Sequence, residues 1–312
     1  MATIEELFGI PGAKGDLPVK PAGDHTPAPS SNYAFKEDIL RVLLLWTFGP
    51  QVLNLYLTGP TGCGKSSVIE QFAARLGLGV IRVGCHSRME MPDLVGRFVL
   101  NQTGGMDFTD GPLVQAMRLG CIFLLDEADL LPPPVAMGLN AVLDGSPLFI
   151  PETKERLFGQ PGFRIAVTGN SAGAGDSTGL YRGVVRQNLA WMDRFVVLSV
   201  DYLSEAEEVV ILRKAVPNLP EQLAAKMVQV AGAVRQQYLG SSAGDASLDI
   251  TLSTRTLVRW AQLSDAWRLA KQTNPLKLAL QHALLNRASP STAIAINGIA
   301  ARMLGDLYER EA

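Results

Sequence analysis

The stretch Gly59-Pro-Thr-Gly-Cys-Gly-Lys65-Ser66 combines three glycines with a lysine and a hydroxyl side chain. It fits the pattern G-x-x-x-x-G-K-[ST] at every required position, which predicts a loop that binds phosphate. Glycines let the backbone fold around an anion, so that N–H groups and the positive end of the next helix face it. We expect Lys65 to reach the β- and γ-phosphates and the Ser66 hydroxyl to hold Mg²⁺. The residues expected to contact the nucleotide here are Gly59, Pro60, Thr61, Gly62, Cys63, Gly64, Lys65, Ser66 and Ser67.

Two acidic residues, Asp126 and Glu127, follow the apolar run 121–125. Such a run suits a strand buried on both faces of a parallel sheet, and α/β sheets bind ligands where strands end. We expect Asp126 to hold Mg²⁺ and Glu127 to orient and polarise an attacking water. Asn170 ends the next buried run, 164–168, and its amide is expected to touch the γ-phosphate or fix the water. An ordinary Gly-Asn turn is the alternative.

The elements that must position these residues follow from the flanking patterns. Residues 54–58 predict a strand and 67–76 a helix that stops at Gly77, which is the context that the loop requires. Further strands are expected at 79–84 and 196–200, and helical spacing of apolar residues predicts a helix over 36–48. One β-hairpin is expected over 97–108, with a Gly-Gly turn. A second is expected between 148–150 and Phe163, around 152–160.

The composition changes twice along the chain. Residues 1–32 begin with a small amphipathic patch and continue from 11 to 31 as a Pro- and Gly-rich stretch, which predicts a flexible linker. The patch is expected either to dock on the body or a neighbouring subunit, or to fray. Residues 33–202 form the predicted α/β domain. Residues 203–312 form a predicted smaller all-α domain, with helices near 204–215, 219–239, 254–271, 275–287 and 290–309.

The bulk numbers narrow the class of protein. The chain has 312 residues, 47% hydrophobic and 19% charged, which suggests about two domains. A net charge of −2 gives no overall attraction to nucleic acid or to an anionic membrane. Three cysteines do not make a disulfide framework, so we expect them to be reduced. The acidic start is unlike a signal peptide, and the longest apolar run, 42–46, is too short to span a bilayer. We therefore expect a cytoplasmic protein.

The order of these parts resembles that of an AAA+ ATPase of the MoxR-like clade. Several short motifs are most similar to the ATPase subunit of aerobic cobaltochelatases: Glu6-Leu-Phe-Gly-Ile10, Asp93-Leu-Val-Gly96, Gly175-Asp-Ser-Thr-Gly-Leu-Tyr181, Gln187-Asn188, Met192-Asp-Arg-Phe195 and Ser253-Thr-Arg255-Thr. The resemblance implies a three-layer α/β/α P-loop domain with a five-stranded parallel sheet and two hairpin insertions, followed by an α-helical lid. It implies ATP and Mg²⁺ bound at the seams of a ring, usually of six copies. Asn170 then corresponds to the first sensor, Arg194 to the arginine finger that reaches a neighbour's nucleotide, and Arg255 to the second sensor. Surface ion pairs are the alternative for both arginines.

The resemblance also implies partners. Relatives of this clade commonly work with a protein that bears a von Willebrand A domain. In cobaltochelatases that protein and a large chelating subunit complete an enzyme that inserts cobalt into hydrogenobyrinate diamide. This chain departs from the pattern at the hairpin tip, 102–105, and beyond about Lys271. The motor is therefore better supported than its client.

Three functions remain open from the sequence. The first is an ATP-driven motor that remodels a protein, either in cobalt chelation or in the activation of another metalloenzyme or complex. The second is a nucleic-acid motor, which the small number of positive charges in the predicted hairpins disfavours. The third is a scaffold that binds ATP but barely hydrolyses it, which the intact Asp126-Glu127 pair disfavours.

Overall fold

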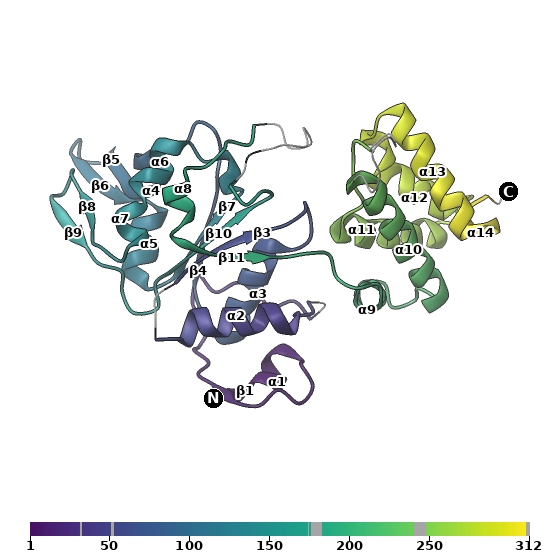
Figure 1. The fold of residues 1–312 in the computed structure, drawn as a ribbon, viewed down its shortest axis with the longest axis horizontal. Helices are drawn as coiled ribbons and strands as arrows, with labels where there is room; N and C mark the ends of the chain where they lie inside the picture. The colour runs from purple at the N-terminus through teal and green to yellow at the C-terminus, as the bar shows by residue number, and fades with distance from the viewer. Residues whose placement is uncertain (32, 51–52, 174, 176–182, 240–247, 310–312) are drawn as a thin grey trace. The chain divides into compact units, whose positions relative to one another are not determined.

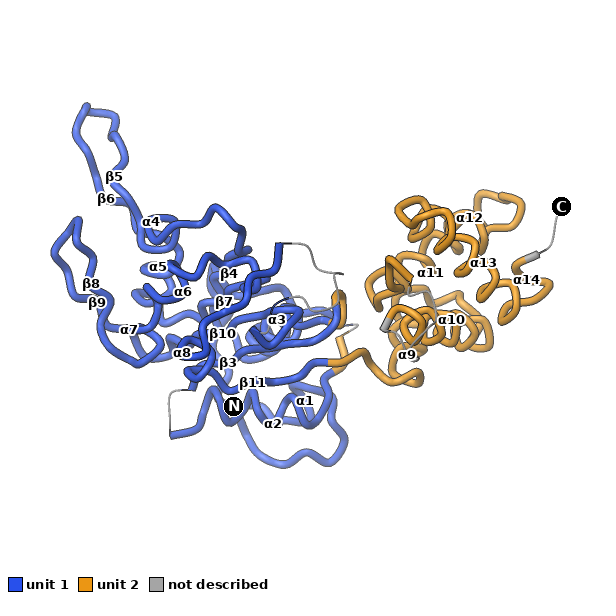
Figure 2. The backbone as a smooth tube through the Cα atoms, turned by 45° about the horizontal axis from the view of Figure 1, so that its top comes forward, with its two compact units in different colours: residues 1–31, 35–60, 64–200 blue, residues 32–34, 61–63, 201–312 orange. Residues whose placement is uncertain are grey.

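A computed structural model describes residues 1–31, 33–50, 53–173, 175, 183–239 and 248–309. The chain divides into two compact units, which Figure 2 colours separately. The first comprises residues 1–31, 35–60 and 64–200. The second comprises residues 201–312 with the short stretches 32–34 and 61–63.

A parallel sheet forms the centre of the first unit (Figure 1). Its five strands lie in the order β11-β3-β10-β7-β4, and every neighbouring pair is parallel. Their bounds are β3 Asn54–Thr58, β4 Val80–Gly84, β7 Ile122–Asp126, β10 Arg164–Gly169 and β11 Phe195–Ser199. Because all five run the same way, the residues after β3, β7 and β10 meet at one edge of the sheet.

Helices cover both faces of this sheet. On one face, α4 (Met91–Val95), α5 (Pro112–Leu119), α6 (Pro133–Gly138), α7 (Asn140–Leu143) and α8 (Leu189–Met192) bury a core against alternate strand residues such as Tyr56, Phe123 and Val167. On the other, α2 (Glu37–Phe48) and α3 (Lys65–Leu76) pack below the sheet in Figure 1. The period of two in a strand sends successive side chains to opposite faces. The predicted fold, a three-layer α/β/α domain, is confirmed.

Both predicted hairpins are present. The first pairs β5 (Gly96–Leu100) with β6 (Met106–Asp110), as predicted. The second pairs β8 (Leu148–Ile150) with β9 (Glu155–Leu157), so its return strand precedes the predicted position at Phe163. The turn comes earlier because Lys154 adopts a left-handed conformation, with φ 59°, and Leu157 then buries its side chain opposite Leu148.

The N-terminal segment packs on the first unit. Phe8, at the end of α1 (Ile4–Phe8), stacks on Phe72 with ring centroids 5.6 Å apart and meets Phe35 edge-on at 5.0 Å. The stretch 11–31, predicted to be a flexible linker, makes backbone contacts with the segments around it. Strand β2 (Asp16–Leu17) pairs with β1 (Ala2–Thr3), and the backbones of Lys20 and His25 hydrogen-bond to Leu76 and Val80. This segment has few apolar side chains to bury, so backbone hydrogen bonds hold it in place. One of them joins it to β4, the edge strand of the sheet.

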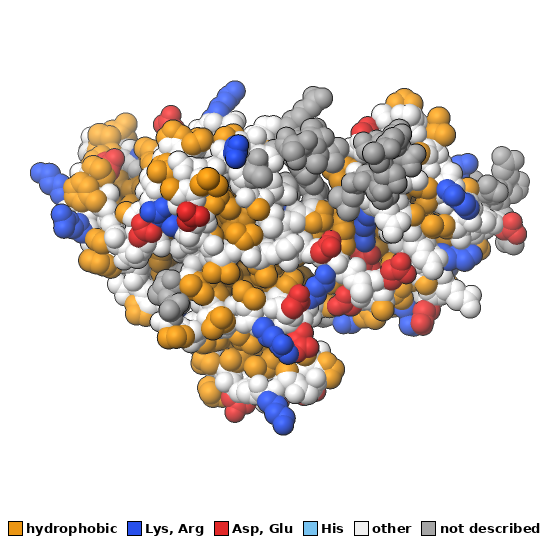
Figure 3. Space-filling view, viewed as in Figure 1, with side chains coloured by type: hydrophobic (Ala, Val, Ile, Leu, Met, Phe, Trp, Pro, Cys, Tyr) orange, Lys and Arg blue, Asp and Glu red, His pale blue; other side chains and the backbone are white. Residues whose placement is uncertain are grey.

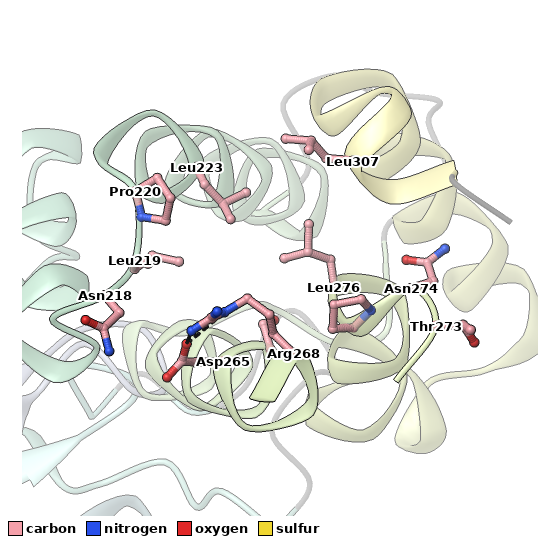
Figure 4. Close-up of a pocket in the computed structure, with 12 residues that line it drawn as sticks. Asn218, Leu219, Pro220, Leu223, Asp265, Arg268, Thr273, Asn274, Leu276 and Leu307 are labelled. Atoms are coloured by element: carbon pink, nitrogen blue, oxygen red, sulfur yellow. Dashed lines mark hydrogen bonds and ion pairs between the residues drawn. The ribbon is translucent and has the colours of Figure 1, made fainter. Parts of the chain in front are cut away.

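Among its described residues, the second unit contains helices joined by loops and no strand. Its helices are α9 (Glu205–Ala215), α10 (Glu221–Leu239), α11 (Thr254–Leu269), α12 (Pro275–Ala283), α13 (Pro290–Leu304) and α14 (Asp306–Glu309). The last predicted helix breaks at Gly305, whose φ is 57°. A cavity of about 400 Å³ lies among α10, α11, α12 and α14, with apolar walls that include Leu223 and Leu276 and the Asp265–Arg268 ion pair at its side (Figure 4).

Candidate functional site

The glycine loop joins β3 directly to α3 at the carboxyl edge of the sheet. Gly62 and Gly64 have φ angles of 74° and 99°, a left-handed conformation that residues with a Cβ rarely adopt. Gly64 precedes the first residue of α3 and has no side chain that could cap the helix. The first-turn N–H groups of this helix are therefore not capped by that residue, which is the arrangement that anion-binding helix ends use.

Lys65 connects the loop with the end of β10. Its ammonium group donates to the carbonyl oxygens of Gly59 at 2.7 Å and Pro60 at 3.0 Å, and to Oδ1 of Asn170 at 2.9 Å. The sheet order explains this contact, because β3 and β10 are direct neighbours. The structure thus brings two of the predicted site residues, 105 positions apart, into one hydrogen bond.

Asp126 lies at the centre of a second set of contacts. One carboxylate oxygen accepts from the hydroxyl groups of Ser66 and Thr168, both at 2.5 Å, and the other accepts from the Arg82 guanidinium. Burial opposes ionisation of Asp126, but these hydrogen bonds outweigh it and lower the pKa of the carboxyl group. A hydroxyl and a carboxylate oxygen side by side are donors that suit Mg²⁺, which takes few protein ligands and keeps several waters. Ser66 and Asp126 therefore fit the predicted ion.

Glu127 directly follows β7 in a strained backbone conformation. Its φ of 59° and ψ of 42° are left-handed, and its N–H donates to the Thr168 hydroxyl at 3.1 Å. Such a conformation costs on the order of 1–3 kcal/mol in a residue with a side chain, and it persists where surrounding contacts hold it. Here it leaves the side chain exposed at the edge of the sheet that also carries Lys65 and Asn170.

Asp129 is a buried residue that holds the backbone at this edge of the sheet, and it was not predicted from the sequence. The side chain is 1% exposed and accepts hydrogen bonds from the Tyr56 hydroxyl at 2.9 Å, the Ser171 hydroxyl at 3.0 Å and the backbone N–H groups of Asn170 and Ser171. Burial, and then the charge of Asp129, raises the pKa of Tyr56. The carboxylate therefore fixes the backbone of Asn170. Its spacing after Asp126 was the available signal, but a third acid at the start of a loop is common.

Arg194 lies at the opposite edge of the sheet. It directly precedes Phe195, which pairs with Asn54 at the amino end of β3, whereas the glycine loop follows the carboxyl end of that strand. Five strand residues at about 3.3 Å each separate the two edges by roughly 16 Å. Arg194 forms a two-pronged ion pair with Asp144, Nε to Oδ1 at 2.8 Å and Nη2 to Oδ2 at 2.9 Å. The structure does not bring Arg194 to the loop of its own chain.

Arg255 lies exposed in the first turn of α11, in the second unit. A buried ion pair lies beside the start of this helix. Arg235 donates to both carboxylate oxygens of Glu208 at 2.8 Å and to the carbonyl oxygen of Leu252, just before the helix. The Thr254 hydroxyl donates to the same Glu208 carboxylate at 2.5 Å. The start of α11 is therefore fixed within its unit. The role predicted for Arg255 stays a prediction.

Three further observations concern the described part of the chain. No group of three His, Cys, Asp or Glu residues in it could hold a metal ion. None of its helices combines the length and apolar character needed to span a bilayer. Most of the predicted motif Gly175–Tyr181 lies outside the described residues, which resume at Gly183.

Comparison with known proteins adds to this geometry. The family model "AAA domain (dynein-related subfamily)" matches residues 54–183, and the model "CbbQ/NirQ/NorQ C-terminal" matches residues 207–303. The aerobic cobaltochelatase subunit CobS of a Sinorhizobium species is 32% identical over 271 residues, which cover 83% of this chain and 79% of CobS. The denitrification regulatory protein NirQ of Stutzerimonas stutzeri is 33% identical, over 69% of this chain and 74% of NirQ. Midasin of Dictyostelium discoideum is 34% identical over 67% of this chain but only 3% of Midasin.

Proposed function

Because this chain belongs to the MoxR-like clade of AAA+ ATPases, with CobS, NirQ, NorQ and CbbQ as relatives, we propose that it hydrolyses ATP to remodel a partner protein. One observation carries the proposal. Lys65, Ser66, Asp126, Glu127 and Asn170 lie at or just after the ends of three neighbouring strands, at one edge of the sheet. Hydrogen bonds link Lys65 to Asn170 and Ser66 to Asp126.

Each of these side chains has a distinct part in the hydrolysis. Lys65 neutralises charge on the β- and γ-phosphates, and the loop N–H groups hold the remaining oxygens. Glu127 accepts a hydrogen bond from the attacking water and orients it, while the Asn170 amide donates to the γ-phosphate or the water. Mg²⁺ held by Ser66 and Asp126 would neutralise charge that develops on the phosphate oxygens. The products are ADP and inorganic phosphate.

The position of Arg194 supports a ring of subunits, usually six in this clade. An arginine at the amino edge of the sheet is too far from its own glycine loop, but a neighbouring copy can receive it at a subunit seam. An arginine that reaches the γ-phosphate in this way accelerates hydrolysis by about 10³- to 10⁵-fold. Arg255 is proposed to touch the nucleotide as the second sensor.

The two hairpins support a protein as the client. The hairpins and their flanks expose apolar side chains: Phe98, Val99, Leu100, Met106, Phe149 and Phe158. Figure 3 shows apolar side chains gathered over this end of the first unit. The positive charges of the hairpins are few, and one of them, Arg97, is paired with Asp93 at 2.9 Å. A nucleic-acid motor needs clustered basic side chains, whereas exposed apolar patches are typical of protein contacts.

The proposed client is a chelatase-type complex, with a von Willebrand A partner and a large chelating subunit. The similarity to CobS over most of both chains supports it. Activation of another metalloenzyme or complex is the second candidate, because the helical unit matches a family model named for CbbQ, NirQ and NorQ. Cobalt insertion by the reconstituted chelatase, with and without this chain, separates the two. Equal insertion in both cases would exclude the chelatase client while leaving the ATPase intact.

Glu127→Gln tests the ATPase. The amide keeps the shape of the side chain but accepts water poorly, so phosphate release should fall by roughly 100-fold or more, with ATP binding and ring assembly retained. The matched control is Glu37→Gln, which removes an exposed acid paired with Arg41 in α2 and should not change turnover. Undiminished phosphate release by Glu127→Gln in assembled protein would refute the proposed role of Glu127.

A further inference from the structure

We propose that Asp144 is a positioning residue that orients the Arg194 guanidinium toward the nucleotide of a neighbouring subunit. This inference rests on the proposed function, in which Arg194 acts across the seam of a ring. The observation that carries it is the two-pronged pair between the two side chains, Nε to Oδ1 at 2.8 Å and Nη2 to Oδ2 at 2.9 Å.

The hydrogens of the guanidinium show why this pair leaves Arg194 able to act. Arginine has five N–H groups in a fixed plane. Asp144 takes the Nε–H and one hydrogen of Nη2, and the carbonyl oxygen of Ala190 takes one hydrogen of Nη1. Two N–H groups, one on each terminal nitrogen, remain for an anion. The side chain is 26% exposed, so an approaching phosphate can meet them.

The backbones on both sides of this ion pair are also joined. The Asn54 side chain is 7% exposed, and its amide nitrogen donates to the carbonyl oxygens of Leu143 at 2.9 Å and Arg194 at 3.1 Å. Leu143 directly precedes Asp144, so one buried amide fixes both residues of the pair at the first position of β3. The Asp144 carboxylate is thereby fixed relative to Arg194, so the two hydrogen bonds set the orientation of the guanidinium plane.

A role in positioning differs from a role in stability. Exposed ion pairs contribute little to folding, and Asp144 is 48% exposed. Asp144→Asn places an amide NH₂ where one guanidinium N–H needs an acceptor, so the two-pronged pair is lost while the shape is kept. Misplacement of a reacting group by about 1 Å can reduce the rate 100-fold. The expected effect is therefore on turnover rather than on folding.

The experiment measures ATP turnover, the KM for ATP, ring assembly and thermal unfolding for wild type, Asp144→Asn, Arg194→Ala and Glu37→Gln. For Asp144→Asn we expect kcat to fall by about 10- to 100-fold, with KM within about twofold. The unfolding midpoint should stay within roughly 3 °C of wild type. Arg194→Ala sets the lower limit, a loss of about 10³-fold or more. Glu37→Gln also breaks an exposed ion pair and should match wild type.

A mixing experiment assigns the effect to the correct active site. Rings that combine Lys65→Ala subunits with Asp144→Asn subunits place intact arginines beside intact nucleotide sites. Turnover of the mixture should exceed the mean of the two separate preparations. No gain on mixing, a kcat of Asp144→Asn within twofold of wild type, or loss of ring assembly in this variant would each overturn the proposal. Wild-type protein that fails to hydrolyse ATP would instead refute the proposed function.

Discussion

Removal of a single hydroxyl group by Tyr56→Phe tests how the edge of the sheet is held. Tyr56 lies in β3, and its hydroxyl donates to the carboxylate of Asp129 at 2.9 Å, with the carbonyl oxygen of Ser171 at 3.0 Å as a second acceptor. Asp129 in turn binds the backbone N–H of Asn170, whose side chain contacts Lys65. The substitution therefore weakens a chain of contacts that ends in the proposed site.

The magnitude follows from the burial and charge of the acceptor. A hydrogen bond to a charged group contributes about 1.5–3 kcal/mol to stability. Asp129 is 1% exposed but keeps three other donors, so we expect a loss of about 2 kcal/mol in the free energy of unfolding. For a unit of this size, that loss lowers the melting temperature by about 4–8 °C. The shift of Asn170 should also lower kcat, by roughly tenfold.

The assay pairs thermal unfolding with steady-state ATP turnover, and Tyr308→Phe is the matched control. Tyr308 lies in the helical unit, and its hydroxyl donates to the neutral amide oxygen of Asn297 at 2.5 Å. This control should lose only about 1 kcal/mol and keep the wild-type kcat. If Tyr56→Phe melts and turns over like wild type, or if Tyr308→Phe loses the same turnover, Asp129 does not position Asn170 as argued.

Two other predictions concern titratable groups. The lowered pKa of Asp126 adds stability that is fully present above the ordinary carboxyl value near 4 and is lost as pH falls through the folded value. Urea unfolding should therefore show a smaller acid-induced loss for Asp126→Asn than for wild type below about pH 4, and equal losses would contradict this. Burial first, and then nearby carboxylates, raise the pKa of Cys85 to about 12, whereas Cys63 lies half-buried in the glycine loop. Iodoacetamide at pH 8 should modify Cys63 before Cys85, and Mg²⁺ with ATP should slow the reaction; mass spectrometry that finds the reverse order would refute it.

The site could be predicted from sequence wherever its parts are contiguous. Strand β3, the glycine loop and α3 follow one another directly, and the loop needs glycines at backbone conformations that other residues rarely adopt. Asp126 and Glu127 were identified because acids directly follow an apolar run. The first hairpin was also predicted in full, since its Gly-Gly turn lies between two short apolar stretches.

Contacts between distant residues could not be predicted in this way. Asp129 and Tyr56 are 73 positions apart, and they meet because the sheet places β3, β10 and β7 side by side. The N-terminal patch was expected either to dock or to fray, and the sequence could not show that Phe8 packs on Phe72 of α3. Neither pairing has a local sequence pattern, because each depends on which elements become neighbours in space.

By itself, the sequence determined two features of this protein. The glycines of the loop allow its left-handed backbone conformations, and acidic or hydroxyl side chains directly follow the predicted strands. Both features depend on a few adjacent residues. Only the tertiary structure decided that Arg194 lies at the edge of the sheet opposite its own glycine loop and meets Asp144, 50 positions earlier. The physical reason is the parallel sheet. The order and direction of its strands determine which strand ends lie at the same edge of the sheet. That order depends on burial of the whole core.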